Sequence, residues 1–435
     1  MSVKLNCAIL SCLFVSFIAL TSSARPKRNK KLVFVSTVYR HGDRAPMVIY
    51  PNSPNRAKVW PQGTGQLTQR GMRQEAALGK FLKKRYIENF RFLNRSYIRK
   101  EVSIRSTNVD RTLMSAESQL SSLYPPHGRQ VWNKNLAWQP VPIHTVPKAE
   151  DTLLLAYNLP CKRYMDLKKQ YRMSAEYKNF SNKYEDFLKN VSKLAGYKKP
   201  LNLSNSWKLY DSLFCEQQHD LTLPKWATNE TIETLYHISN FGMMALFHGK
   251  PAQQIAAGVL VHRIINDMKL VRAGKKDRPI KMMMYSSHDT TVMALLCALS
   301  IANGLQPPYS AAVLIELYVD NKKDYFVQIL YRNSTNSPYV LTIPGCSTYC
   351  PLDKFIKLTS AVAAPPGNFS ELCNKKATVT KEHFPFATAI VIAIGGFLLG
   401  MIISYATCTT RKNVNTSNKG PNLLSDYEYN SLKPL

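Results

Sequence analysis

Three segments of this chain share one order of residue types: an apolar run, a polar cluster, and then a stretch with helical periodicity. The apolar runs are Lys31–Tyr39, Val102–Ile104 and Ile280–Tyr285. Continuous apolar runs are typical of strands that are buried on both faces of a sheet. Repeated strand–turn–helix units favour a parallel sheet with helices on its faces. The sequence therefore predicts an α/β fold with a mostly parallel central sheet flanked by helices.

The polar clusters follow the runs at the point where each strand is expected to end. They begin at Arg40, Arg105 and Ser286. Sheets of this kind bind their ligands beyond the carboxyl ends of the strands. We therefore expect the three clusters to meet at one edge of the sheet.

The rest of the folded part divides into a sheet-forming core and a helical insertion. Residues 146–259 have mainly helical patterns, whereas the proline-rich stretch 125–147 predicts an extended crossover. We expect an α/β core at about 30–145 and 260–375, with a smaller helical domain inserted at about 146–259. Two alternating runs, Ala311–Tyr318 and Tyr325–Tyr331, predict further strands that could pair as a hairpin.

Both ends of the chain have the features of targeting segments. Residues 1–24 combine Lys4, an apolar run and a small-residue cleavage site, which predicts a secretory signal peptide. Residues 384–407 carry no charge and are long enough for a transmembrane helix, which needs about 20 apolar residues. This order predicts a type I single-pass protein, with a luminal or extracellular ectodomain at 25–383 and a cytoplasmic tail at 408–435.

The tail contains a short pattern that is typical of sorting signals. Tyr429 and Leu432 fit the tyrosine-x-x-bulky motif, which sorting adaptors bind as an extended peptide. We therefore expect a location in the endosomal or lysosomal membrane, with passage through the plasma membrane allowed.

The cysteines and glycosylation motifs agree with an oxidising compartment. The six ectodomain cysteines are Cys161, Cys215, Cys297, Cys346, Cys350 and Cys373. An even number in a secreted region suggests disulfides, with fifteen complete pairings open, and the closely spaced Cys346 and Cys350 are expected to bond to each other. Glycosylation sequons are present at Asn94, Asn179, Asn190, Asn202, Asn229, Asn333 and Asn368.

The chain carries a large positive charge, which would ordinarily suggest a nucleic-acid binder. The formal net charge is +30, of which +27 lies in the ectodomain. Residues 161–200 alone contain eleven Lys or Arg against four acids. Because the ectodomain is separated from the cytosol, nucleic acid is not an expected partner. Phosphorylated or other acidic partners remain open, and so does a solvated surface charge without a partner.

The clusters at the strand ends contain the groups that phosphoryl transfer requires. Arg40, Arg44 and Arg105 offer planar guanidinium groups that match phosphate oxygens. His41 can act as a nucleophile that forms a covalent intermediate, and Asp289 can supply the proton for the leaving group. No D-x-D, H-E-x-x-H or P-loop run is present, so a site without metal or other cofactor is favoured.

The run R-H-G-x-R-x-P at 40–46 and the pair His288-Asp289 resemble the signature of the histidine acid phosphatases, branch 2 of the histidine phosphatase superfamily. Further similar segments are QLTQRGMRQ, IRSTNVDRTLMSA, WQPVPIHTVP, YSSHDTTV and PGCSTYCPL. These segments are most similar to those of the lysosomal and prostatic acid phosphatases, and the resemblance covers about residues 32–375.

The resemblance implies a role for each of these residues. His41 would attack phosphorus and become phosphohistidine, and Asp289 would protonate the leaving group. Asp289 must therefore hold a proton before the reaction, so activity should favour acidic pH. The phosphate-binding residues would be Arg40, Arg44, Arg105 and His288.

The resemblance also implies disulfides Cys161–Cys373 and Cys346–Cys350, and a homodimer that the segment with Trp138 and His144 helps to form. A core tryptophan beside a solvent-facing histidine is the other interpretation of that segment. In the family, the counterpart of Cys215 pairs with a cysteine that is missing from Tyr309–Val313 here. Cys215 and Cys297 therefore either pair with each other or remain thiols.

The sequence thus predicts an acid phosphatase that hydrolyses phosphate monoesters through phosphohistidine, in a type I membrane glycoprotein of endosomes or lysosomes. The alternatives are a cell-surface nucleotide monophosphatase and a non-catalytic membrane glycoprotein that binds anionic ligands.

Overall fold

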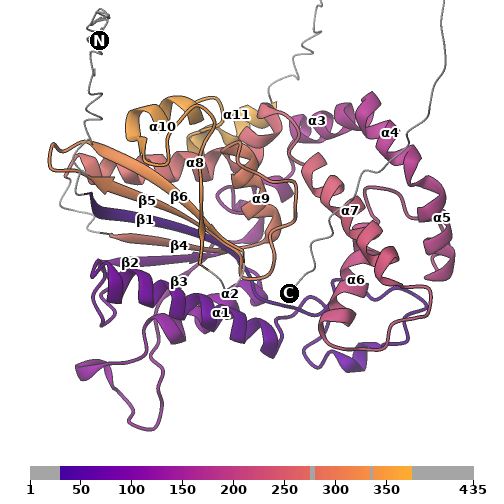
Figure 1. Ribbon diagram of the computed structural model, residues 1–435, viewed down its shortest axis with the longest axis horizontal. Coiled ribbons are helices and arrows are strands. Elements are labelled where there is room, and N and C mark those ends of the chain that lie inside the picture. The colour runs from indigo at the N-terminus through magenta and orange to yellow at the C-terminus, as the bar shows by residue number, and fades with distance from the viewer. Residues whose placement is uncertain (1–29, 275–279, 334–336, 375–435) are drawn as a thin grey trace, which may run out of the picture. The chain divides into compact units, whose positions relative to one another are not determined.

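The computed structural model describes residues 30–274, 280–333 and 337–374 (Figure 1). The predicted signal peptide 1–24, transmembrane helix 384–407 and sorting residues Tyr429 and Leu432 lie outside these residues. Within the described part of the chain, no helix combines the length and the apolar character that crossing a membrane requires.

The centre of the fold is one eight-stranded sheet. Its strands are β1 (Lys31–Arg40), β2 (Val102–Ser106), β3 (Ile143–His144), β4 (Met282–Ser287), β5 (Ala312–Val319), β6 (Tyr325–Arg332), β7 (Tyr339–Leu341) and β8 (Cys350–Pro351). They lie in the order β3-β2-β4-β1-β5-β6-β7, and β8 pairs with β6.

The sheet is mixed, so the prediction of a mostly parallel sheet was wrong. The pairs β3–β2, β2–β4 and β4–β1 are parallel, whereas β1–β5, β5–β6, β6–β7 and β6–β8 are antiparallel. One physical reason is the short connection between β5 and β6, because a short turn can join only antiparallel neighbours, whereas a parallel pair needs a long crossover. The hairpin that was predicted from the two alternating runs is present as β5 and β6.

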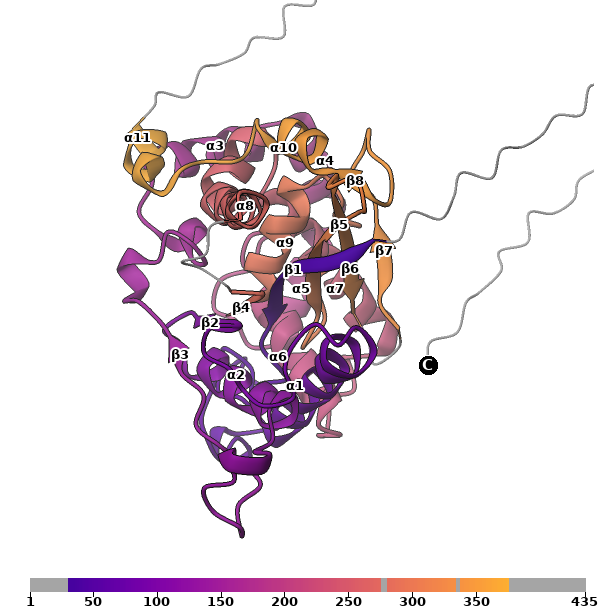
Figure 2. The ribbon, with the colours of Figure 1, turned by 90° about the vertical axis from the view of Figure 1, so that its left-hand side faces the viewer.

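Helices cover both faces of the sheet, and others form a group beside it (Figures 1 and 2). On one face lie α1 (Gln69–Leu82) and α2 (Asp110–Leu123), and on the other lie α8 (Lys250–Arg272), α9 (Asp289–Ala298), α10 (Leu352–Thr359) and α11 (Phe369–Asn374). The group beside the sheet consists of α3 (Lys162–Arg172), α4 (Ala175–Lys183), α5 (Glu185–Leu194), α6 (Trp207–Gln218) and α7 (Asn229–Ala245).

Alternation along β1 divides the core into two layers. Val35 and Tyr39 pack in the cluster with α1 and α2, whereas Phe34 and Val38 pack in the cluster with α8 and α9. Because successive strand residues point to opposite faces, an almost continuous apolar strand serves both layers.

A separate apolar cluster holds the helical group together. It includes Leu188 of α5, Leu213 of α6 and Leu235 of α7. The boundaries of an inserted domain at 146–259 stay a prediction, since all described residues fall in one compact unit.

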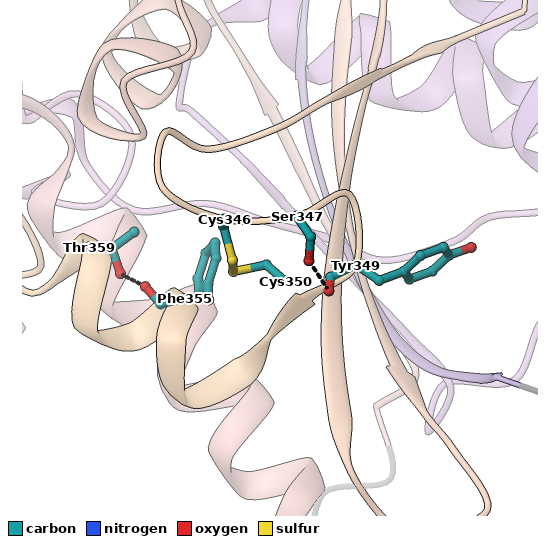
Figure 3. The surroundings of a disulfide bond; sticks show 6 residues. All are labelled: Cys346, Ser347, Tyr349, Cys350, Phe355 and Thr359. Atoms are coloured by element: carbon teal, nitrogen blue, oxygen red, sulfur yellow. Dashed lines mark hydrogen bonds between the residues drawn. A yellow bond between two sulfur atoms is a disulfide. The ribbon is translucent and has the colours of Figure 1, made fainter. Parts of the chain in front are cut away.

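Two disulfides cross-link the part of the chain that the structure describes. Cys161, which precedes α3, bonds to Cys373 of α11. Cys346 bonds to Cys350, which closes a short loop before α10, and Phe355 of that helix lies beside this disulfide (Figure 3). Cys215 and Cys297 are buried free thiols.

Candidate active site

The site begins where two parallel neighbours end. Arg40, the last residue of β1, lies opposite Ser287, the last residue of β4. The backbone N–H of His41 donates to the Ser287 carbonyl at 3.0 Å. The two motifs found in the sequence, whose paired residues Arg40 and Ser287 are 247 positions apart, therefore leave the sheet side by side, as the parallel register requires.

A glycine allows the motif loop to pack closely on α1. A Cβ atom on Gly42 would collide with the backbone of Gly71 in the first turn of that helix. Asp43, also in the loop, is fully buried, and its carboxylate contacts the hydroxyl of Thr68 and lies 2.6 Å from Nε2 of His219. Asp43, to which the sequence assigned no role, thus ties the loop to α1 and to the end of α6.

The loop and the start of α9 open into a cavity of about 910 Å³. The charged and imidazole side chains that line it are Arg40, His41, Arg44, Arg111, Lys148, Asp211, His288 and Asp289. Most of the remaining lining is apolar or aromatic and comes from α6, α7 and the segment before α3. A phosphate group and an apolar leaving group would both find matching surfaces here.

His41 presents one nitrogen to this cavity as a neutral base. Its Nδ1 is 2.8 Å from the Gly42 carbonyl, so Nδ1 carries the proton and donates it to that oxygen. Nε2 is then left with a lone pair. Burial lowers the pKa of His41 well below its usual value, and the cations of Arg111 and Arg40 lower it further. His41 therefore stays neutral, with Nε2 unprotonated, as a nucleophile must be.

Asp289 is held by Arg40. The carboxylate lies 2.9 Å from the guanidinium, which also donates to the Pro307 carbonyl at 2.6 Å and stacks over the Tyr309 ring. Burial alone raises the pKa of Asp289, but the positive charges of Arg40 and Arg44 outweigh it and lower the pKa below its usual value. These charges favour the ionised form of Asp289, whereas the role predicted for it requires a proton.

Arg44 is paired with a carboxylate from the helical group. Its guanidinium makes two hydrogen bonds to Asp211 of α6, at 2.8 and 3.1 Å. Burial lowers the pKa of Arg44, but the Asp211 carboxylate more than compensates and raises it well above its usual value. This pair fixes one fork of the guanidinium and joins the helical group to the motif loop.

His288 is neutral and orients a cation. Its Nδ1 lies 3.3 Å from a guanidinium nitrogen of Arg111, and its Nε2 lies 3.0 Å from the Thr107 hydroxyl. Because a guanidinium can only donate, Nδ1 is the acceptor and Nε2 carries the proton. Burial, with a contribution from Arg111, lowers the pKa of His288 to about 3.

Arg105, which the sequence placed among the phosphate ligands, does not line the cavity. Its guanidinium lies 2.9 Å from the carboxylate of Asp151, and both side chains are largely buried. Arg111, six residues further along and at the start of α2, lines the cavity instead. The cavity lining therefore favours Arg111 over Arg105 as a phosphate ligand. Arg111 lies in the same segment, IRSTNVDRTLMSA, but the sequence contains no signal for the direction of its side chain.

Cys215 lies directly behind the site. Its sulfur is 3.9 Å from the Arg44 guanidinium and 3.6 Å from the Tyr309 hydroxyl. Burial raises the pKa of this thiol to about 12. It is therefore an uncharged packing group, and Cys297 contacts Met244 elsewhere.

The remaining surface residues singled out in the sequence are all exposed. This holds for Trp138 and His144 and for the seven sequon asparagines, Asn94, Asn179, Asn190, Asn202, Asn229, Asn333 and Asn368. Trp138 is 37% exposed, so it is not a core residue.

Comparisons of the sequence and of the fold show which known proteins this chain resembles. The model of the histidine phosphatase superfamily (branch 2) matches residues 31–332. Human prostatic acid phosphatase is 44% identical over 369 residues, which cover 84% of this chain and 92% of that protein. Human lysosomal acid phosphatase is 40% identical over 393 residues, which cover 89% of this chain and 90% of that protein.

Among solved structures, the apo form of a phytase from Hafnia alvei matches with a TM-score of 0.57 and 17% identity. The match covers 80% of this chain and 99% of the phytase chain. At that identity the likeness concerns the fold alone.

Proposed function

The chain belongs to the histidine phosphatase superfamily, branch 2, and is an enzyme of the acid phosphatase class; from this premise we propose that it hydrolyses phosphate monoesters through a phosphohistidine at His41. The observation that carries the proposal is the hydrogen bond of His41 Nδ1 to the Gly42 carbonyl, which leaves Nε2 with its lone pair; His41 lines the same cavity as Arg40, Arg44 and Arg111. Three guanidiniums stabilise the charge of the transferring phosphoryl group, as phosphoryl transfer requires.

In the first step Nε2 of His41 attacks phosphorus while the bond from phosphorus to the alcohol oxygen breaks. Asp289 gives its proton to that oxygen, so the alcohol leaves neutral. The phosphorylated imidazole carries a positive charge, and its Nδ1–H remains bonded to the Gly42 carbonyl. In the second step Asp289 accepts a proton from water, the water oxygen bonds to phosphorus, and the bond to His41 breaks.

The ionised state of Asp289 fits this scheme once substrate charge is included. A phosphate dianion next to Asp289 competes for the Arg40 guanidinium, and both effects raise the pKa of the carboxyl group. Substrate binding would therefore favour protonation of Asp289, most readily at acidic pH. His288 would keep Arg111 aimed at the phosphate, and it would donate directly once its Nδ1 is protonated.

The cellular setting is part of the proposal. Relatives named lysosomal acid phosphatase and the tyrosine motif at Tyr429 both favour a glycoprotein of the lysosomal or endosomal membrane. The exposed Trp138 and His144 favour a homodimer through that segment. A cell-surface nucleotide monophosphatase would use the same chemistry, whereas a non-catalytic binder would not need the neutral base at His41.

The direct test is to trap the intermediate. Full-length protein mixed with a phosphate-labelled aryl phosphate and quenched in alkali should carry acid-labile label on the peptide that contains His41. Label that is absent, or that lies on another residue, would refute the proposed route.

A further inference from the structure

The cavity is larger and more apolar than phosphate chemistry needs. Beyond the polar groups, its walls include Leu155, Tyr157, Trp207 and Phe214. Trp207 is 39% exposed, so this wall reaches solvent. The part of the substrate that leaves as the alcohol therefore lies against apolar surface.

Lys148 stands out in the charge balance of the cavity. The acids that line it are Asp211 and Asp289, and each is paired with an arginine. Lys148 also lines the cavity, is exposed, and forms no ion pair among the described residues. It is thus a cation that the mechanism does not use.

The backbone of Lys148 is held firmly. It begins a short 3-10 helix, Lys148–Glu150, that follows Pro147. The next residue, Asp151, is fully buried, pairs with Arg105 at 2.9 Å and accepts from the Leu154 N–H at 3.0 Å. The segment is therefore fastened to β2, which fixes the position of Lys148 at the cavity wall. Arg105 acquires a positioning role through this contact.

We propose that Lys148 forms a second anion subsite, which selects phosphomonoesters whose leaving group joins an apolar body to a further acidic group. This inference rests on the proposed function, because it concerns the same cavity and the same reaction. The phosphoryl group occupies the arginines, the apolar body contacts the wall with Trp207, and the second acid pairs with the Lys148 ammonium. A partly exposed ion pair of this kind changes affinity by about fivefold or less, and charge reversal by more.

The test compares charged and neutral versions of one leaving group. Full-length enzyme is assayed with 4-sulfophenyl phosphate and 4-(3-sulfopropyl)phenyl phosphate, and with the uncharged primary sulfonamide of each. The sulfonate stays ionised at every pH used, so the ratio of kcat/KM for sulfonate to sulfonamide measures charge selectivity. Phenyl phosphate reports the basal reaction.

We expect the sulfonate-to-sulfonamide ratio of the wild type to exceed that of the variants for at least one of the two leaving-group lengths. The ratio should fall by up to about fivefold in Lys148→Ala and by more in Lys148→Glu. Lys80→Glu, on the exposed side of α1 and outside the cavity, is the matched control and should keep the wild-type ratio. A wild-type ratio that Lys148 variants leave unchanged at both lengths would overturn the subsite. Failure of the wild type on phenyl phosphate would instead overturn the proposed function, so the two failures are distinguishable.

Discussion

The carboxylate of Asp289 lies 2.9 Å from the guanidinium of Arg40, the residue next to His41. This pair couples the group proposed as acid to a group proposed to bind phosphate. A phosphate that binds to Arg40 weakens this pair and so raises the pKa of Asp289, which Arg40 had lowered. Substrate binding and protonation of the acid are therefore linked.

The first prediction concerns the nucleophile. His41→Ala should reduce hydrolysis of an aryl phosphate near pH 5, without added metal, by more than about a thousandfold, since the other imidazole that lines the cavity, His288, is held by Arg111. Steady-state rates of the full-length protein measure this. An unchanged melting temperature in the variant is the control for folding, and full activity would exclude His41 as the nucleophile.

Asp289→Asn should slow alkyl phosphates more than aryl phosphates. Alkoxides are poor leaving groups and depend on a general acid, which contributes typically about a hundredfold to ten-thousandfold, whereas phenolates leave with less help. The measurement is kcat/KM for a phenyl and an alkyl phosphate in both proteins. Equal losses on the two substrates would argue that Asp289 acts through Arg40 alone.

Arg111 and Arg105 should respond differently to substitution. Arg111→Lys should weaken inhibition by inorganic phosphate and raise KM, because the fork that faces the cavity is lost. Arg105→Met should instead lower the free energy of unfolding by about 3 kcal/mol or more, because it leaves Asp151 buried without its partner. Inhibition constants and denaturant titrations of both variants decide the matter; the reverse pattern would restore Arg105 as the ligand.

The stability of the fold should fall between pH 7 and pH 5, in part through His288. Its folded pKa of about 3 lies below the unfolded value near 6.5, so below pH 6.5 the unfolded chain takes up a proton that the folded one does not. This difference costs about 2 kcal/mol over that interval. Denaturant titrations at the two pH values should show a smaller drop in His288→Asn than in the wild type. An identical drop in both proteins would contradict the lowered pKa.

Tyr429→Ala should move the protein towards the plasma membrane. Adaptors that bind the tyrosine motif need its phenol ring, and Leu432→Ala should act in the same direction. Surface biotinylation of cells that express each variant measures the shift, with Tyr427→Ala as the neighbouring control. A distribution identical to wild type would refute the sorting role.

Strand-scale patterns predicted the position of the site well. Apolar runs before Arg40 and Ser286 indicated buried strands, and β1 and β4 lie next to each other with their polar ends aligned. That step needs only the rule for parallel neighbours. The helix that starts at Asp289 likewise follows from the periodicity after the polar cluster.

Side-chain direction was beyond the reach of the sequence. Arg105 and Arg111 occur in one cluster, but the first is in β2 and the second follows a turn into α2. Which of them enters the cavity depends on the conformation of that turn and on Asp151, which is 46 residues away from Arg105 and buries its carboxylate there. The charge state of Asp289 depends in the same way on Arg40 and Arg44, whose distances no pattern encodes.

The Cys161–Cys373 disulfide makes a covalent ring of the chain between these residues, and only some of the site residues lie within this ring. Asp211, His288 and Asp289 belong to the ring, whereas His41 and Arg111 lie in the part of the chain that precedes it. The nucleophile is thus joined to its acid by sheet pairing and by a single run of backbone. A protease cut between Arg111 and Cys161 would leave two fragments that stay together only while the fold persists, and that separate under denaturing conditions even with both disulfides intact.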